Sequence, residues 1–180
     1  LSRPHMPYKG LIMAILISPM IVPLIITAAG MFFFYARINL VYSFTGIILA
    51  HVALATPFVV ITVTATLVGF DMNMVKASQS LGARPIRTFF KVIMPLILPG
   101  VISGALFAFI TSFDEVVIVM FMGSLDQLTI PKQMWAGIRQ EISPVILCMA
   151  TCLVVLSILL LTTVELLRRR SEKLRGITSR

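Results

Sequence analysis

The sequence predicts an all-α membrane protein: a polytopic bundle of four transmembrane helices, with one long polar loop between the second and third. Of its 180 residues, 58% are hydrophobic and only 12% are charged, whereas soluble domains carry about 25% charged residues. The apolar residues form four runs, each reaching the roughly 20 residues that a helix needs to cross a bilayer. Barrel strands are excluded because the runs lack their strict alternation. The predicted spans are residues 11–36, 44–70, 92–122 and 144–166.

The first run is predicted to be a retained span, because it is longer than the apolar region of a signal peptide. It contains Pro19 and Pro23, which lack a backbone N–H and are expected to kink the helix. A kinked helix favours a bundle over a lone membrane anchor. The chain begins at Leu1 rather than Met, which leaves room for further sequence before it.

The basic residues predict the orientation of the bundle. The net charge is +8, but the Lys and Arg residues gather at the ends of the apolar runs, which argues against a nucleic-acid partner. With a cytoplasmic N-terminus, only Arg37, Lys132 and Arg139 of the fifteen Lys and Arg residues lie outside, and the positive-inside rule favours this arrangement. Both ends of the chain, the 71–91 loop and the basic tail 167–180 are then cytoplasmic. The tail is also expected to attract anionic membrane lipid.

The 71–91 loop has the pattern of short amphipathic helices broken at Gly82 and Pro85. Met74, Ala77 and Leu81 recur at helical spacing, so one face is expected to pack on the bundle or on a partner. On the outer side, residues 123–143 repeat apolar side chains at similar spacing around Trp135. An interfacial helix is predicted there, with a docking surface for an external partner as the alternative.

Polar side chains interrupt the third span: Thr111, Ser112, Asp114 and Glu115. A carboxylate at the centre of a membrane helix costs about 2.5 to 3.5 kcal/mol, so these acids are expected to face protein, water or a cation. One interpretation is a solute pathway lined by Asp114, Glu115, Thr111 and His51. The alternative is an internal contact with His51 or with a cation on another chain. Adjacent helical residues point about 100° apart, so only one acid is expected to face a pore.

No nucleophile, metal-ligand cluster or nucleotide-binding motif accompanies these groups, so no catalytic residue, metal or cofactor is predicted and an enzyme is disfavoured. The polar loop instead carries small and helix-breaking residues at fixed spacing: Lys76, Ala77, Ser78, Gly82, Ala83, Val92, Met94 and Pro95. This segment resembles the EAA signature of binding-protein-dependent ABC permeases, which reads Glu-Ala-Ala, three residues, Gly, nine residues, Ile, one residue, Leu-Pro. The spacing from Gly82 to Pro95 matches throughout, and Lys76 departs from the family's Glu.

The resemblance implies a cytoplasmic coupling helix that docks on a separate ATPase subunit, with Lys76, Ala77, Ser78, Gly82, Ala83 and Pro95 at the coupling site. Small residues allow close approach, and glycine tolerates the sharp turn between two short helices. The other implied partners are a second permease subunit and a periplasmic solute-binding protein, in the bacterial inner membrane.

The stretch 112–117 is similar to that of the spermidine/putrescine branch of these permeases, which implies a small cationic solute. The family usually has six spans, so the chain resembles a C-terminal portion. A fragment of a secondary transporter and a membrane subunit that transports nothing are the alternatives. A secondary transporter also uses intramembrane acids and broken helices, but it would not explain the spacing from Gly82 to Pro95.

Overall fold

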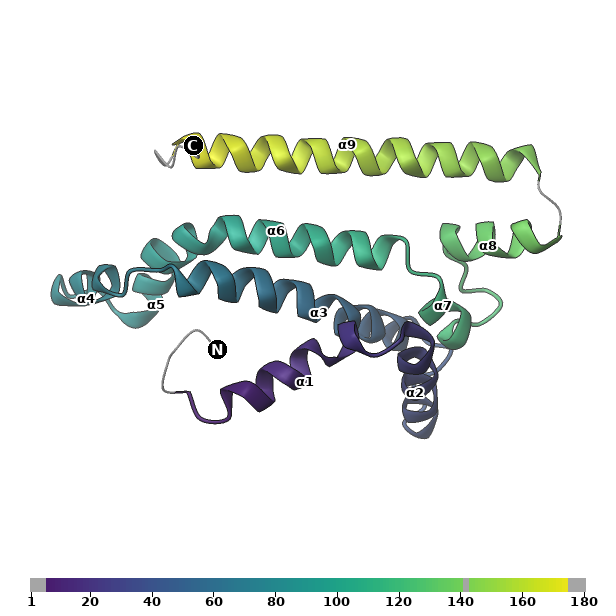
Figure 1. Ribbon diagram of the computed structural model, residues 1–180, viewed down its shortest axis with the longest axis horizontal. Helices are drawn as coiled ribbons and strands as arrows, with labels where there is room; N and C mark the ends of the chain where they lie inside the picture. Colours follow the sequence, from purple (N-terminus) through teal and green to yellow (C-terminus); the bar gives the residue numbers. More distant parts are fainter. Residues whose placement is uncertain (1–5, 141–142, 175–180) are drawn as a thin grey trace.

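The computed structural model describes residues 6–140 and 143–174, and every regular element in those ranges is a helix. Three long helical stretches lie roughly side by side, with shorter helices at both ends of the bundle (Figure 1). The elements are α1 (Lys9–Ile21), α2 (Leu24–Arg37), α3 (Phe44–Val68), α4 (Asn73–Ser80), α5 (Pro85–Thr88), the π-helical turn η1 (Phe89–Ile93), α6 (Met94–Phe113), α7 (Val117–Met122), α8 (Ile130–Gln140) and α9 (Pro144–Leu174).

Within the described residues, three stretches are long and apolar enough to cross a membrane: Phe44–Val68, Pro85–Phe113 and Pro144–Thr163. The predicted all-helical membrane bundle is confirmed. The second stretch starts earlier than residue 92, because α5, η1 and α6 run on as one helix from Pro85. The last seven residues assigned to the polar loop therefore extend the span. Helix α9 reaches Leu174, and the rest of the predicted tail lies outside the described residues.

The first apolar run differs from a straight span over 11–36, because α1 and α2 meet at an angle of 109°. The bend lies at Pro23, one of the two prolines expected to kink this run. Val22 is extended, with φ −74° and ψ 135°, as a residue before proline prefers. Pro19 stays inside α1. The pair makes a fourth crossing only if the bent unit as a whole passes through the membrane.

Two glycines bring α3 and α6 into close contact along the centre of the bundle (Figure 1). A Cβ atom built on Gly104 would lie 2.5 Å from Thr62 Oγ1 and 3.0 Å from Val59 Cα. One built on Gly100 would lie 2.9 Å from Thr66 Cβ. Small residues four positions apart let helix backbones approach closely in a membrane, where apolar burial between helices supplies little driving force. This pair is the scaffold from which the functional segments extend.

The third predicted span, 92–122, is also interrupted. Helix α6 ends at Phe113, and the chain turns before the short helix α7 begins at Val117. Helix α7 packs in a small core with α2 and α3, formed by Ala28, Ala50, Leu54, Ile118 and Met122. The backbone N–H of Tyr42 donates to the Met122 carbonyl at 2.9 Å, which ties the loop before α3 to the end of α7. The turn between α6 and α7 is thus held by tertiary contacts.

Candidate functional site

The loop that matches the coupling motif folds as two short helices, α4 and α5, separated at Gly82 as predicted. Gly82 has φ +78°, a left-handed backbone that glycine adopts without steric cost. Its N–H donates to Gln79 O at 2.9 Å, and the N–H of Ala83 donates to Ser78 O at 3.1 Å. These bonds use carbonyls that would otherwise be unpaired at the end of α4. The glycine therefore fixes the turn between the two helices.

A side-chain hydrogen bond ties α4 to the start of the long helix. Ser78 Oγ and Thr88 Oγ1 are 3.0 Å apart, and Thr88 is only 2% exposed. Beside this bond lies a hollow of about 540 Å³, whose lining includes Ala77, Ser78, Gly82 and Ala83. Four of the six residues predicted for coupling are thus brought together.

The remaining two lie apart from the hollow. Lys76 is exposed on α4 and has no carboxylate partner within the described residues. Pro95 lies in the first turn of α6, directly after the π-helical turn η1. A proline inside a helix cannot donate to the carbonyl four residues earlier and its ring crowds that carbonyl, so the widened turn at η1 accommodates it. The π-helical turn thus lets the helix run on from the loop into the span despite Pro95.

The expected apolar face of α4 is not packed on the bundle. Leu81 is 88% exposed and Met74 is 49% exposed, although both were expected to turn towards a packing partner. The exposure leaves this face available to another subunit.

The two adjacent acids of the third span, Asp114 and Glu115, have different surroundings in the structure. Glu115 is 7% exposed, and its Oε1 accepts a hydrogen bond from the backbone N–H of Ile118 at 2.8 Å. The first N–H groups of a helix lack partners in their own helix, so this carboxylate caps α7. Asp114 is exposed, and its carboxylate has no hydrogen bond or ion pair within the described residues. Only one acid of the pair is therefore free to meet a solute.

His51 and Thr111 were predicted to line a solute pathway with Asp114, but they do not lie beside it in the groove. His51 Nδ1 and Ser112 Oγ are 2.8 Å apart, which joins α3 to α6, and the buried Nε2 has no hydrogen-bond partner among the described residues. Thr111 Oγ1 donates to Phe107 O at 2.9 Å within its own helix. Neither residue lines the groove beside Asp114. Among the residues that the structure describes, no three His, Cys, Asp or Glu side chains lie close enough together to hold a metal ion.

Asp114 opens into an apolar groove of about 400 Å³ between the end of α6, α8 and α9. The lining includes Phe113 and Trp135, together with Leu153 and Val154 of α9, and Asp114 is the one charged residue among its described lining residues. Leu153 and Val154 stand at the middle of the apolar stretch Pro144–Thr163. Asp114 thus lies beside the middle of that stretch and directly after the end of the membrane-long stretch Pro85–Phe113. A charge among apolar walls is unfavourable unless a cation or water meets it.

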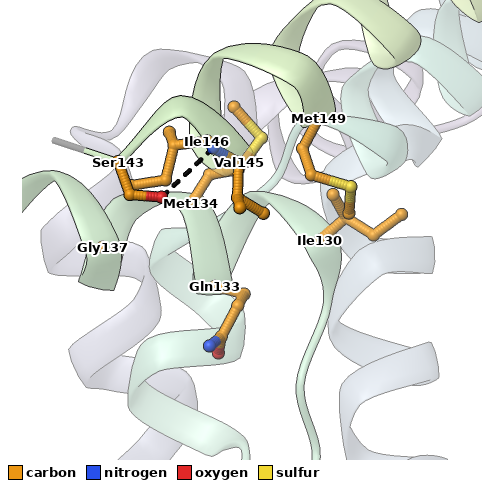
Figure 2. A pocket seen from close by; sticks show the side chains of 8 residues that line it. All are labelled: Ile130, Gln133, Met134, Gly137, Ser143, Val145, Ile146 and Met149. Atoms are coloured by element: carbon orange, nitrogen blue, oxygen red, sulfur yellow. Dashed lines mark hydrogen bonds between the residues drawn. The ribbon is translucent and has the colours of Figure 1, made fainter.

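A second cavity, of about 540 Å³, lies between α8 and the start of α9 (Figure 2). Figure 2 shows its described lining, which combines apolar side chains with Gln133 and Ser143. Gly137 allows the close approach here, because a Cβ built on it would lie 2.6 Å from Ile146 Cδ1. The described lining residues of this cavity carry no charge, so the groove at Asp114 is the better candidate for a charged solute.

The sequence analysis did not predict that Trp135 and the α9 residues Leu153 and Val154 line the groove beside Asp114. The spacing of Ile130, Met134 and Ile138 indicated a helix at the membrane surface, and a helix, α8, does form there in the chain. Nothing in that spacing indicates which element the helix faces. The guanidinium carbon of Arg139 lies 5.5 Å from the centroid of the Trp135 ring, so the ring already holds a cation on one face.

The capping role of Glu115 gives a first prediction. Glu115→Gln keeps an oxygen that can accept from the Ile118 N–H, so it is expected to retain uptake within about twofold of the wild type. Glu115→Ala leaves a buried N–H unpaired at about 1 to 3 kcal/mol, and it is expected to lower thermal stability and uptake together. Thermal unfolding in detergent and uptake rates check both variants. A large loss of uptake in Glu115→Gln with unchanged stability would mean that Glu115 contacts the solute directly.

The described residues thus combine a broken membrane-long helix, a carboxylate in an apolar groove and an exposed polar loop. The chain belongs to the family of binding-protein-dependent transport system inner membrane components, whose sequence profile matches residues 2–173. This is the family class predicted from the 71–91 loop. It is consistent with a multi-pass protein of the inner membrane.

Among its relatives are polyamine permeases. The chain is 30% identical over 164 residues to the spermidine/putrescine transport system permease protein PotC of Haemophilus influenzae, covering 91% of the chain and 62% of that protein. It is 29% identical over 165 residues to PotC of Escherichia coli K12, and 29% identical over 140 residues to the putrescine transport system permease protein PotI of the same strain. These alignments cover 92% and 74% of the chain, and 61% and 50% of the relatives. The chain spans about three fifths of the PotC length.

Proposed function

We propose that this chain forms part of the solute pathway of an ATP-driven importer for small aliphatic cations such as polyamines. The observation that carries the proposal is Asp114, an unpaired carboxylate in an apolar groove with Phe113 and Trp135. A polyamine combines ammonium groups with methylene segments. The carboxylate attracts the ammonium, the aromatic face adds about 0.5 to 2 kcal/mol through a cation–π contact, and the apolar walls accept the methylenes.

The energy of this attraction is moderate, which suits a site that a solute passes through better than a site that holds it tightly. Two opposite unit charges about 4 Å apart gain about 4 kcal/mol at the effective dielectric constant of a protein surface. One carboxylate therefore holds one ammonium group with moderate strength, and the rest of a polyamine stays free to move. The names of the relatives, spermidine/putrescine and putrescine permeases, agree with this solute class.

The partners follow from the family and from the exposed loop. The 71–91 loop docks on an ATPase subunit, a second permease subunit completes the pathway, and a periplasmic binding protein delivers the solute. The loop and both ends of the chain face the cytoplasm, because twelve of the fifteen Lys and Arg residues then lie inside. Exposed Leu81 and Met74 are the apolar contacts of the ATPase.

Reconstitution of the complete transporter tests the proposal. The full-length permease is co-expressed with its genomic neighbours, placed in proteoliposomes with the binding protein, and assayed with radiolabelled putrescine and spermidine. Uptake is expected only with both ATP and the binding protein, and an ATPase subunit that binds but cannot hydrolyse ATP is the control. Uptake driven by an ion gradient without ATP would indicate a secondary transporter. Absence of uptake in an intact complex would indicate a subunit that transports nothing.

A further inference from the structure

The 71–91 loop carries an excess of positive charge that the chain does not neutralise. Its basic residues are Lys76, Arg84, Arg87 and Lys91, and its one acidic residue is Asp71. All four basic side chains are exposed, and none has a carboxylate partner within the described residues. Asp71 is occupied locally, because its Oδ1 accepts from the N–H of Asn73 at 2.9 Å. With four exposed cations against one acid, the loop presents an excess of positive charge to whatever binds it.

These charges surround an apolar contact surface. The hollow of about 540 Å³ is lined by Met74, Leu81 and Val92, with Arg87 and Lys91 also among its lining residues. Leu81 is 88% exposed beside it. A partner that covers this surface must bury apolar side chains and at the same time neutralise the surrounding cations, since buried charges without partners are strongly unfavourable. Carboxylates placed around an apolar side chain meet both requirements.

The position of the loop favours a protein partner over lipid. Figure 1 shows α4 projecting past the ends of α3 and α6, away from the membrane-long parts of the bundle. Lys76 lies on α4, and Arg84 lies at the turn between α4 and α5. Attraction to anionic headgroups falls off within a Debye length, about 8 Å at physiological salt, so Lys76 on α4 is placed less well for lipid than Arg87 and Lys91, which lie in the membrane-long stretch Pro85–Phe113.

We propose that the ATPase surface that receives the 71–91 loop is acidic, with carboxylates that pair with Lys76 and Arg84 around the apolar contact of Leu81. This inference rests on the proposed function, in which an ATPase subunit is the partner. It reverses the charge at the first motif position, where the resemblance to the EAA signature gives Glu and this chain has Lys76. Charge pairs of this kind decide which partner is accepted, because like charges at an interface repel the wrong one.

The test measures binding of the purified ATPase subunit to the complete permease complex in nanodiscs of zwitterionic lipid. The double variant Lys76→Glu/Arg84→Glu is expected to weaken binding about tenfold or more at low salt, and wild-type affinity is expected to fall as salt rises from about 50 to about 300 mM. Arg37→Glu is the matched control, since Arg37 is an exposed cation at the end of α2 and outside the loop. It is expected to bind like the wild type.

A zero-length carbodiimide cross-link gives a second, independent readout, because it joins a lysine amine directly to a carboxylate. Lys76 is expected to link to an Asp or Glu of the ATPase subunit, and Lys76→Arg is expected to abolish that link while retaining binding. Equal binding by the double variant and Arg37→Glu, with no link from Lys76, would overturn the inference. If the wild-type complex itself retains no ATPase subunit, the proposed function fails instead. If added anionic lipid displaces the ATPase, the loop recognises headgroups and the inference is overturned.

Discussion

Gly104→Leu is expected to separate α3 from α6 and to remove most of the folded protein from the membrane. The built Cβ atom would lie 3.0 Å from the backbone atom Val59 Cα and 2.5 Å from Thr62 Oγ1. The threonine hydroxyl has little freedom to move, because it donates to Phe58 O at 2.9 Å. Overpacking usually costs about 1 to 3 kcal/mol even where side chains can adjust. Here a backbone must move, so we expect a loss of about 3 kcal/mol or more.

Gly30→Leu is the matched control for this substitution. Gly30 lies within α2, and a Cβ atom built on it meets nothing within 4 Å. Fluorescence-detected size exclusion and thermal unfolding in detergent measure the yield and stability of both variants. The close packing of α3 on α6 would be contradicted if Gly104→Leu and Gly30→Leu had the same yield and melting temperature. Gly104→Ala is expected to fall between Gly104→Leu and the wild type.

Asp114→Asn is expected to reduce uptake of putrescine or spermidine about 30-fold at low solute concentration, chiefly through a higher KM. The amide has nearly the shape of the carboxylate but no charge, so the groove persists while the attraction for an ammonium group is lost. A loss of about 2 kcal/mol, half of the Coulomb estimate at about 4 Å, corresponds to about a 30-fold change. Stability is expected to hold or to rise, because the carboxylate has no partner within the described residues.

The control for the charge effect is Asp126→Asn. Asp126 is an exposed acid in the loop after α7 and does not line the groove. Initial uptake rates over a range of solute concentrations separate KM from the maximal rate. If Asp114→Asn and Trp135→Leu both transport with an unchanged KM, the groove is not on the solute route. A fall in the maximal rate alone would assign Asp114 to the opening of the pathway rather than to solute attraction.

Of the two acids in the third span, the structure leaves only Asp114 as a candidate for contact with a solute. Their adjacency in sequence suggested a joint pathway role, and geometry on a helix already implied that one of them faces elsewhere. The capping hydrogen bond from Ile118 to Glu115 supplies the reason, since an unpaired N–H at the start of α7 needs an acceptor. The predicted companions His51 and Thr111 are held by Ser112 and by a backbone carbonyl. The candidate site is therefore Asp114 with aromatic and apolar neighbours.

The sequence by itself determined the features that depend on local composition and spacing. Long apolar runs require helices in a membrane, because no water is present to satisfy the backbone. The turn at Gly82 follows from the one residue type that adopts φ +78° freely. The fixed spacing from Gly82 to Pro95 was enough to indicate the family that the comparison established. Each of these inferences uses residues that are close together in the chain.

Only the tertiary structure decided the features that join distant segments. The groove combines Asp114 with Trp135 and with Leu153 and Val154, residues that are about 20 to 40 positions further along the chain. The turn after Phe113 depends on the packing of α7 against α2 and α3. Hydropathy fixes how long a helix is, but it does not say which face meets which neighbour, because packing between membrane helices depends on shape and on a few polar contacts.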